Sequence, residues 1–372
     1  MRVVEVSNYK DFVHLEKTWN DVLSRSCNTV FSSWEWLSTW WKHFGDDKKL
    51  LLLLAEENGK IMGIAPLMYS LYKMFGLRQA KIEFIGTPNS DYNDFILADK
   101  KEQCVKSFIE YLYDLPEKWN CIDLLDIPED SQSLPLLREL TKTLKPHDAC
   151  PFVGLPKSYE ALLDKLSAKQ RKHIRNGFRR LEKDFKVDFL DYSAGQSVVE
   201  GMNTFFDLHQ KRWNAVGLPG FFGNQKARRF HLDVSRSFSQ KGWLGLFLLK
   251  LSGKTVAAYY GYKYLGKFSS YLSGYDPKYS QYSIGNLLTA YVMRNCIESE
   301  IVEFDFMRGA EEYKFHWNAL TRWNHQAFLI KKGFWASSEN RLYNEYWIQG
   351  KKLKHIMNNP QRTLASALKR AG

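Results

Sequence analysis

The spacing of hydrophobic and polar positions predicts a series of helices and strands over the first 130 residues. In chain order, the pattern predicts helices over 11–25 and 33–44, strands over 50–55, 61–69 and 81–85, a helix over 100–114 and a buried strand over 121–127. Asn58-Gly59 separates two of the strands and is a strong hairpin signal. Ser32 or Ser33 is the expected N-cap of the second helix.

The second half of the chain repeats this order. The pattern predicts helices over 159–184 and 197–215, strands over 244–251, 255–264 and 267–275, a polar loop over 276–283, a helix over 286–299 and a strand over 301–307. Residues 50–66 align without gaps on 244–260, and both stretches contain an apolar strand, a turn ending in Gly-Lys and a second apolar strand. Five elements in the same order indicate an internal duplication.

The duplication predicts an α/β fold with two mixed sheets that lie side by side, with a cleft between them. We expect domains at 1–150 and 151–335, joined by a linker at 146–156 that contains three prolines and Gly154. A basic helical tail is expected at 336–372. It is interpreted as a packed helix with a frayed end, or alternatively as a membrane-docking segment.

Composition limits the possible environments. The five cysteines (27, 104, 121, 150 and 296) contain no CxxC pair, so we expect free thiols and no disulfide partner. The nine scattered histidines show no ligand spacing, so no metal is expected. No apolar run approaches the length of a membrane span, and no signal peptide is visible. We therefore expect a cytoplasmic protein, with peripheral contact at the inner membrane face left open.

The net charge of +12 is unevenly distributed. Residues 1–150 contain 18 Lys and Arg against 23 Asp and Glu, and residues 151–372 contain 35 against 18. Eight of these basic residues lie between Lys165 and Lys183. A solvated basic face is one explanation, and an entry surface for the phosphates of coenzyme A, for tRNA or for anionic lipid is the other.

Several segments together resemble the GNAT acyltransferase superfamily, in its BioF2-like or CelD-like branch, which is related to the Fem-type aminoacyl transferases with tandem GNAT-like domains. The segments that carry the resemblance are 31–36, 90–94, 166–182, 208–217, 246–260, 282–288, 303–309 and 313–314. The resemblance covers roughly residues 10–330. It implies tandem GNAT-like domains and transfer of an acyl group from a thioester to an amine or hydroxyl.

The resemblance implies a phosphate cradle at the start of the helix after the fourth strand of the second half. That position holds Ser283, Ile284, Gly285 and Asn286. Free backbone N–H groups and the helix dipole favour phosphate there, and Gly285 lets the backbone approach it closely. The loop has one glycine, fewer than the family pattern, and the alternative is that Ser283 is only an N-cap.

Four residues are candidates for the chemistry itself. His209 is a candidate base, with Arg212 and Trp213 beside it on the same helix as substrate-binding residues. Asp305 interrupts an apolar strand on the same face as Glu303 and is a second candidate base. Tyr313 is expected to protonate the leaving thiolate, and Lys314 to stabilise the tetrahedral intermediate. The alternatives are a core histidine, a packed tyrosine, a surface lysine, and an Asp305 that is ion-paired with Arg308, Lys314 or the basic helix.

In the first half, Asp91, Tyr92 and Asp94 are candidates for binding a polar acceptor, or alternatively form an Asx-turn cluster. The leading hypothesis is an enzyme, an N- or O-acyltransferase that uses acetyl-CoA or another acyl-CoA. Its acceptor would be a small molecule such as an amino-sugar or a cell-envelope precursor. A Fem-like transferase that uses aminoacyl-tRNA, and a non-catalytic protein that binds polyanions, are the alternatives.

Overall fold

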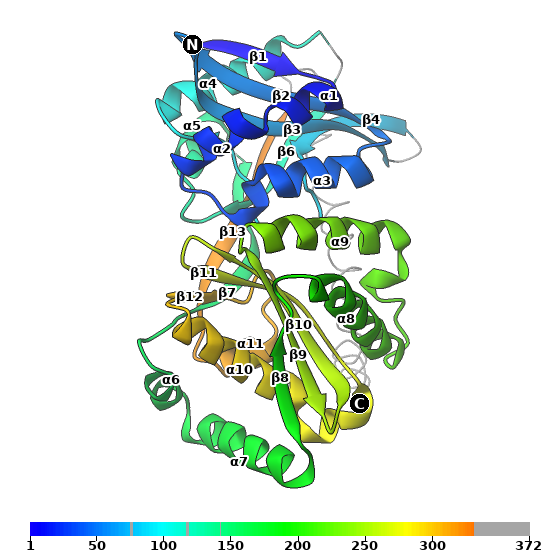
Figure 1. The fold of residues 1–372 in the computed structure, drawn as a ribbon. Helices are drawn as coiled ribbons and strands as arrows, with labels where there is room; N and C mark the ends of the chain where they lie inside the picture. The colour runs from blue at the N-terminus through cyan, green and yellow to red at the C-terminus, as the bar shows by residue number, and fades with distance from the viewer. Residues whose placement is uncertain (75–76, 117–118, 142, 331–372) are drawn as a thin grey trace, which may run out of the picture.

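The computed structural model describes residues 1–74, 77–116, 119–141 and 143–330, and the predicted tail at 336–372 lies outside them. The described strands form one 13-stranded sheet that runs through two lobes (Figure 1). Its order is β1-β2-β3-β4-β6-β13-β7-β12-β11-β10-β9-β8, with the short β5 paired to β3. The prediction of two separate sheets is therefore wrong, although the mixed α/β class is confirmed.

Lobe 1 occupies the top of Figure 1 and is mostly the first part of the chain. Its elements are β1 (Arg2–Val6), α1 (Tyr9–His14), α2 (Glu16–Ser24), α3 (Trp34–Phe44), β2 (Lys48–Glu57), β3 (Lys60–Met74), β4 (Leu77–Phe84), β5 (Ile96–Leu97), α4 (Lys101–Asp114), β6 (Cys121–Pro128) and α5 (Ser133–Leu140). Asn58 and Gly59 both have positive φ in the β2–β3 turn, which confirms the predicted hairpin. Ser33 caps α3 by accepting from the Trp36 N–H, as predicted.

Lobe 2 lies below lobe 1 in Figure 1 and repeats its arrangement of elements. Its elements are β7 (Thr143–Gly154), α6 (Tyr159–Lys165), α7 (Ala168–Asp184), β8 (Val187–Asp191), α8 (Ser197–Asn214), α9 (Gln225–Gln240), β9 (Leu244–Leu251), β10 (Lys254–Tyr264), β11 (Lys267–Tyr275), α10 (Ile284–Glu298), β12 (Glu303–Asp305) and α11 (Glu312–Phe315), followed by β13 (Leu320–Ile330). The short 3-10 turn η3 (Pro277–Tyr282) links β11 to α10. The pattern did not predict α9, and the helix expected over 159–184 is two helices, because Ser167 caps α7.

The two lobes exchange their last strands. β7 comes directly after the lobe 1 elements but pairs with β12 of lobe 2, whereas β13 follows the lobe 2 elements and pairs with β6 of lobe 1. β7 and β13 also pair with each other and close the sheet at its centre. The segment predicted as a linker is thus mostly the strand β7, and the boundary expected at residue 150 falls inside it.

Three buried clusters hold the sheet to its helices. One lies between the lobes and contains aromatic residues of α3, α8 and α9, such as Trp36, Phe205 and Phe230. The second covers the other face of lobe 2 with α6, α7 and α10, and the third covers the other face of lobe 1 with α4 and α5. The helices of the first cluster join the lobes by apolar burial, the dominant favourable term in folding. No helix within the described ranges is long and apolar enough to cross a membrane.

Candidate functional site

A cleft with a volume of about 240 Å³ lies between the two lobes. We call it the interlobe cleft. Its polar lining comes from lobe 1, lobe 2 and β13, and includes Asn28, Tyr92, Asp94, Asp130, Ser131, Lys267, Ser269, Asp305 and Arg322. Carboxylates, hydroxyls and cations face one enclosed space here, which suits a small polar ligand.

Asp305 lies at the floor of the interlobe cleft and is held by three hydrogen bonds. Its Oδ2 accepts from the Tyr92 hydroxyl at 2.7 Å and from Arg322 Nη2 at 2.9 Å, while Oδ1 accepts from the Met307 N–H at 2.8 Å. Burial raises the pKa of Asp305, and the Arg322 guanidinium opposes that rise. A carboxylate offers about four acceptor positions, so one remains for a ligand.

The predicted alternation along β12 is confirmed. Arg322 contacts both Glu303 and Asp305, so the two carboxylates share the face of the strand that lies toward lobe 1. The predicted ion-pair partner Arg308 does not contact Asp305. Arg322 is the ion-pair partner of Asp305 instead. The sequence pattern did not single out Arg322, because it lies on β13 while Asp305 lies on β12.

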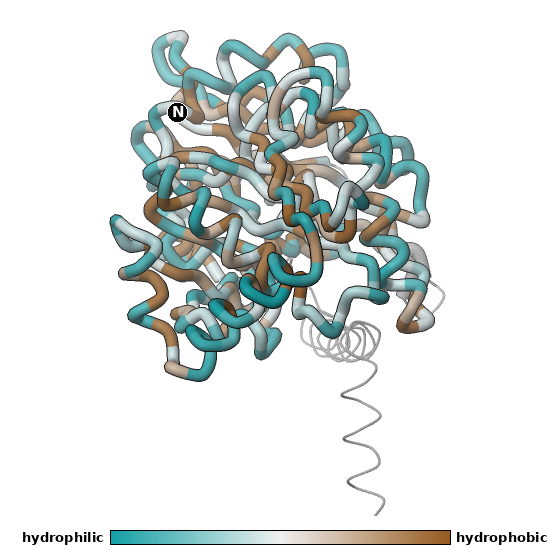
Figure 2. Tube along the Cα trace, turned by 60° about the horizontal axis from the view of Figure 1, so that its bottom comes forward, coloured by the Kyte–Doolittle hydropathy of each residue, from teal (hydrophilic) through white to brown (hydrophobic). Residues whose placement is uncertain are grey.

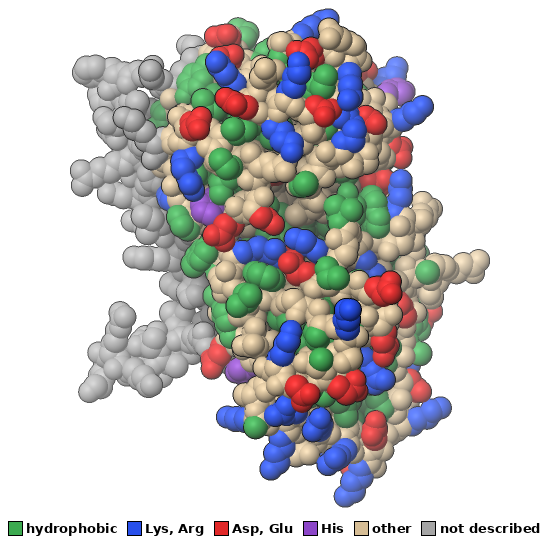
Figure 3. All heavy atoms as spheres, turned by 90° about the vertical axis from the view of Figure 1, so that its left-hand side faces the viewer, with side chains coloured by type: hydrophobic (Ala, Val, Ile, Leu, Met, Phe, Trp, Pro, Cys, Tyr) green, Lys and Arg blue, Asp and Glu red, His purple; other side chains and the backbone are tan. Residues whose placement is uncertain are grey.

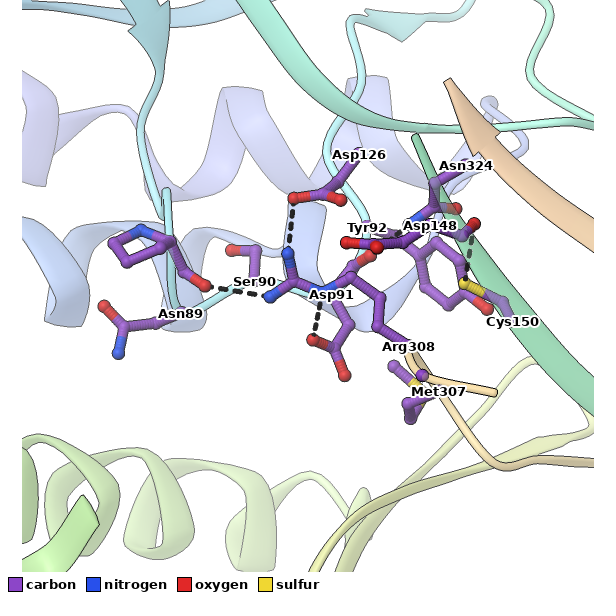
Figure 4. Close-up of polar contacts among 12 residues, drawn as sticks. Asn89, Ser90, Asp91, Tyr92, Asp126, Asp148, Cys150, Met307, Arg308 and Asn324 are labelled. Atoms are coloured by element: carbon purple, nitrogen blue, oxygen red, sulfur yellow. Dashed lines mark hydrogen bonds and ion pairs between the residues drawn. The ribbon is translucent and has the colours of Figure 1, made fainter. Parts of the chain in front are cut away.

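Arg308 joins the lobes through a buried ion-pair cluster (Figure 4). Its guanidinium donates to Asp91 Oδ1 and to Asp126 Oδ2, both at 2.6 Å, and to the Pro88 carbonyl at 2.9 Å. Burial raises the pKa of Asp91, whereas Arg308 and His147 outweigh burial and lower the pKa of Asp126. Asp91 therefore serves the contact between the lobes.

Asp94 and Lys314 also make hydrogen bonds within the protein, Asp94 as an acceptor and Lys314 as a donor. Both oxygens of Asp94 accept hydroxyl hydrogen bonds, from Ser131 and Ser133, and burial raises its pKa to about 6. Lys314 Nζ donates to the carbonyls of residues 307, 308 and 309 at 2.9–3.2 Å. Lys314 is buried, so it is not the surface lysine of one interpretation, and its contacts hold the loop after β12.

The strands β11 and β12 part at the edge of the interlobe cleft. They pair in parallel only from Lys267–Glu303 to Ser269–Asp305, and after Asp305 the chain follows β7 instead. The register between β10 and β11 shifts at the same level, where Tyr260 and Tyr262 face Leu272 and Ser269, so β11 has one extra residue. A bulge leaves backbone groups of that strand outside the ladder. The rest of β11, Ser270–Tyr275, thus borders an opening.

The N-terminus of α10 lies at the far end of this opening. Ser283 has φ 53° and makes no side-chain capping bond, so the first N–H groups of α10 are not capped by it. A Cβ added to Gly285 would meet only the Tyr275 ring, at 3.8 Å. The protein itself thus leaves room at Gly285, and the end of the helix can accept an anion. Ile284 is buried beneath it, and Asn286 accepts from Gln170 at 3.2 Å.

His209, Arg212 and Trp213 lie on the lobe 2 helix α8, away from the interlobe cleft. Burial lowers the pKa of His209 to about 3, and its ring packs against Phe205 and Phe222. Trp213 donates to His209 Nε2 at 3.0 Å, and Arg212 lies over the Tyr275 ring at 4.9 Å. The structure favours the core interpretation of His209, since its imidazole stays neutral and enclosed.

Tyr313 is half exposed in α11, after the loop that follows β12. Its ring lies 6.3 Å from that of Phe306, and it adds to the pKa rise that burial gives Tyr259. The Tyr259 hydroxyl bonds Ser270 Oγ at 2.6 Å, so Tyr313 is beside the opening of β11.

One group of side chains has the composition of a metal site. Ligand atoms of Asp126, His147 and Asp148 lie within 4.8 Å of one another. Asp126, however, already pairs with Arg308 at 2.6 Å and with His147 at 3.0 Å. These contacts explain the arrangement without an ion.

Residues 168–315 match a family model described as an acetyltransferase (GNAT) domain. The matched residues lie wholly within lobe 2, from the start of α7 to the end of α11. This domain class supports acyltransferase activity and bears out the family resemblance read from the sequence. Comparison with curated proteins found no match.

Solved structures share the fold over both lobes. FemX matches with a TM-score of 0.62 at 11% identity, over 88% of this chain and 98% of FemX. L-PGS from Bacillus licheniformis matches with a TM-score of 0.53 at 12% identity, over 88% of this chain and 96% of L-PGS. A conserved protein of unknown function from Bacteroides thetaiotaomicron matches with a TM-score of 0.58 at 14% identity, over 88% of this chain and 100% of that protein. At these identities the similarity concerns the fold alone, which confirms that the GNAT domain is part of a larger two-lobed arrangement.

Proposed function

We propose that the protein transfers an acyl group from a thioester, such as an acyl-CoA, to an amine or hydroxyl of a small polar acceptor. The observation that carries the proposal is the opening between β11 and β12. It meets the N-terminus of α10 at one end and the interlobe cleft, at Asp305, at the other. A donor and an acceptor could therefore reach one point from two directions. An amino-sugar or cell-envelope precursor fits the polar lining of the cleft.

The residues fit the phosphates and the arm of such a donor. The uncapped N–H groups of α10 would hold a phosphate, and Gly285 leaves space for it. The arm would follow Ser270–Tyr275, where the unpaired edge and the bulge of β11 offer backbone donors to the thioester carbonyl. A CoA or phosphopantetheine thioester supplies the activated acyl carbon.

Asp305 and Tyr313 are the proposed proton-transfer groups. The acceptor nitrogen or oxygen forms a bond to the acyl carbon and gives its proton to Asp305. The carbon–sulfur bond then breaks, and the sulfur takes a proton from Tyr313. Asp305 releases its proton to solvent, and Tyr313 regains one from solvent. The raised pKa of Asp305 makes it a better base than an ordinary carboxylate, and Tyr92 and Arg322 orient it.

Calorimetric titration with acetyl-CoA and with S-acetyl-4′-phosphopantetheine tests the donor site. Gly285→Val should reduce affinity for both by about tenfold or more, because the added methyl groups displace the phosphate from the helix N–H groups. Gly154→Val is the matched control, since an added Cβ at Gly154 meets nothing within 4 Å. If the unaltered protein binds neither thioester, or if both variants lose affinity equally, the donor site is wrong.

Release of free thiol in the presence of amino-sugars and other amines tests the base. Asp305→Asn should slow release by about 100-fold or more, the usual contribution of a general base. Asp114→Asn removes an exposed carboxylate at the end of α4, outside the cleft, and should leave the rate unchanged. Equal rates for Asp305→Asn and the unaltered protein would remove Asp305 from the mechanism.

A further inference from the structure

The helix α7 carries a row of cations on its solvent side. We call Lys169, Lys172, Arg175, Arg179 and Lys183 the basic stripe. They are spaced three or four residues apart and so share one face of the helix. All five are exposed. Figure 3 shows Lys and Arg side chains gathered at the lower end of the molecule, where α7 lies in Figure 1, and Figure 2 shows hydrophilic turns across that end.

The charges of the basic stripe are not neutralised by the rest of the described structure. Neighbouring cations on the same helix do have partners, since Arg171 pairs with Asp164 at 2.9 Å and Arg180 contacts Gln281 and Tyr282. Within the described residues, no carboxylate lies at ion-pair distance from any member of the stripe. Exposed charges without partners are available to an external anion.

The same helix packs against the proposed donor site. Gly177 admits the Leu287 side chain of α10, since an added Cβ would lie 2.8 Å from it. Gln170 bonds Asn286, in the first turn of α10, and Arg180 donates to Gln281, just before that helix. The basic stripe is therefore one helix width, about 10 Å, from the N-terminus of α10.

The length of the stripe indicates the size of the ligand. From Lys169 to Lys183 it extends about 21 Å along the helix axis, at 1.5 Å per residue. One pyrophosphate at α10 needs only the nearest end of such a row, so the remaining cations fit a much larger polyanion.

The chemistry of the stripe favours an acidic protein over RNA. Phe178, the single Phe, Tyr or Trp side chain of α7, is partly buried and packs against Phe189 with ring centroids 6.0 Å apart. Single-stranded RNA ends are bound by stacking their bases on aromatic side chains, and the stripe has none. A partner helix, in contrast, presents carboxylates at the same three- and four-residue spacing as the cations.

We propose that the basic stripe docks an acidic carrier protein that delivers the acyl group on a phosphopantetheine arm. This inference rests on the proposed function and names the source of its thioester. The carrier's acidic helix would lie along α7, and its arm would pass over the end of α10 into the opening of β11. The acyl carbon–sulfur bond breaks after the acceptor bond has formed, the sulfur takes its proton from Tyr313, and the thiol stays on the carrier.

Binding of a small acidic acyl carrier protein, with its arm acetylated, tests the inference. Lys172→Glu, Arg175→Glu and Arg179→Glu combined should weaken binding by about tenfold or more, because three exposed charge pairs are lost and the reversed charges add repulsion. Lys10→Glu, Lys17→Glu and Lys106→Glu combined make the same charge change on exposed residues of lobe 1 and should alter binding by about twofold at most. Salt should weaken binding to the unaltered protein.

Three outcomes would overturn the inference. The carrier could fail to bind the unaltered protein, the two triple variants could lose affinity equally, or deacylated tRNA could bind in its place with the same dependence on the stripe. Acetyl-CoA separates this inference from the proposed function. If acetyl-CoA binds the unaltered protein and the α7 variant equally while the carrier binds neither, only the carrier is wrong. If no thioester binds at all, the proposed function falls first.

Discussion

The two lobes share an order of elements but differ in the opening beside their fourth strand. In lobe 2, β11 and β12 part after Ser269 and Asp305, and eight residues separate the end of β11 from the start of α10. In lobe 1, β4 and β6 pair at Lys81–Cys121 and Ile82–Ile122 before they separate. Both lobes thus have the strand arrangement that creates an opening.

In lobe 1, the protein's own chain occupies that opening. The loop after β4 returns to β6, where the Asn93 N–H donates to the Asp126 carbonyl at 2.9 Å and its side chain to the Leu125 carbonyl at 3.3 Å. The same loop supplies Asp91 to Arg308 and Tyr92 to Asp305. The two lobes thus share an order of elements, while the chain leaves the opening free in lobe 2 and fills it in lobe 1.

The largest expected effect on stability comes from removing the Arg308 ion pairs that join the lobes. Arg308→Met leaves Asp91 and Asp126 buried without their cation and should cost about 3–5 kcal/mol of unfolding free energy. Arg294→Met, which breaks an exposed pair with Glu298, should cost less than about 1 kcal/mol. Urea denaturation measures both. Similar losses for the two variants would show that the lobes do not depend on this contact.

The duplication, the hairpins and the polar face of β12 could be predicted from the sequence because they depend on local spacing. The break at Ser167 was missed because basic and apolar residues continue the helical period through it. The exchange of β7 and β13 was missed for a different reason. Pro146 and Pro151 suggested a linker, and the pairing of β7 with β13 joins segments about 170 residues apart that carry no local signal.

The site was predicted unevenly for the same reason. Asp305 was recognisable as a carboxylate in an apolar strand, and Tyr92 as part of a polar loop. Their hydrogen bond joins the two lobes, so the spacing of residues could not reveal it. The role of Arg322 and the position of the interlobe cleft depend on the exchanged strand β13. The sequence pattern did not predict this strand, so it could not predict either of them.

The lobes also differ in the titratable groups that they bury. Two buried histidines of lobe 2 should make the free energy of unfolding depend on pH. His209 and His231, both in lobe 2, have pKa values lowered by burial from 6.5 to about 3. The unfolded chain therefore binds protons first as the pH falls below 6.5, and stability decreases until the pH approaches 3. Each histidine should account for about 2–3 kcal/mol of lost stability between pH 6.5 and 4.5.

His231→Phe isolates one of these contributions. The ring lies among Phe222, Phe230 and Tyr260, so phenylalanine suits its surroundings. Urea denaturation at several pH values should give a flatter dependence than in the unaltered protein. His14→Phe, at an exposed lobe 1 position, should leave the dependence unchanged. If His231→Phe does not flatten the profile, the histidine is protonated or hydrated in the folded state.

The smallest expected effect tests the filled opening of lobe 1 directly. Asn93→Ala removes the hydrogen bond to the Leu125 carbonyl and should cost about 1–2 kcal/mol of unfolding free energy, the usual penalty for a buried carbonyl left without its partner. Thioester affinity should stay within about twofold of the unaltered protein, because the proposed donor site lies in the other lobe. Gly285→Val should show the reverse, with normal stability and weakened thioester binding. If Asn93→Ala weakened thioester binding as strongly as Gly285→Val, the filled opening of lobe 1 would be part of the donor site, and the proposed division of binding and support between the two lobes would be wrong.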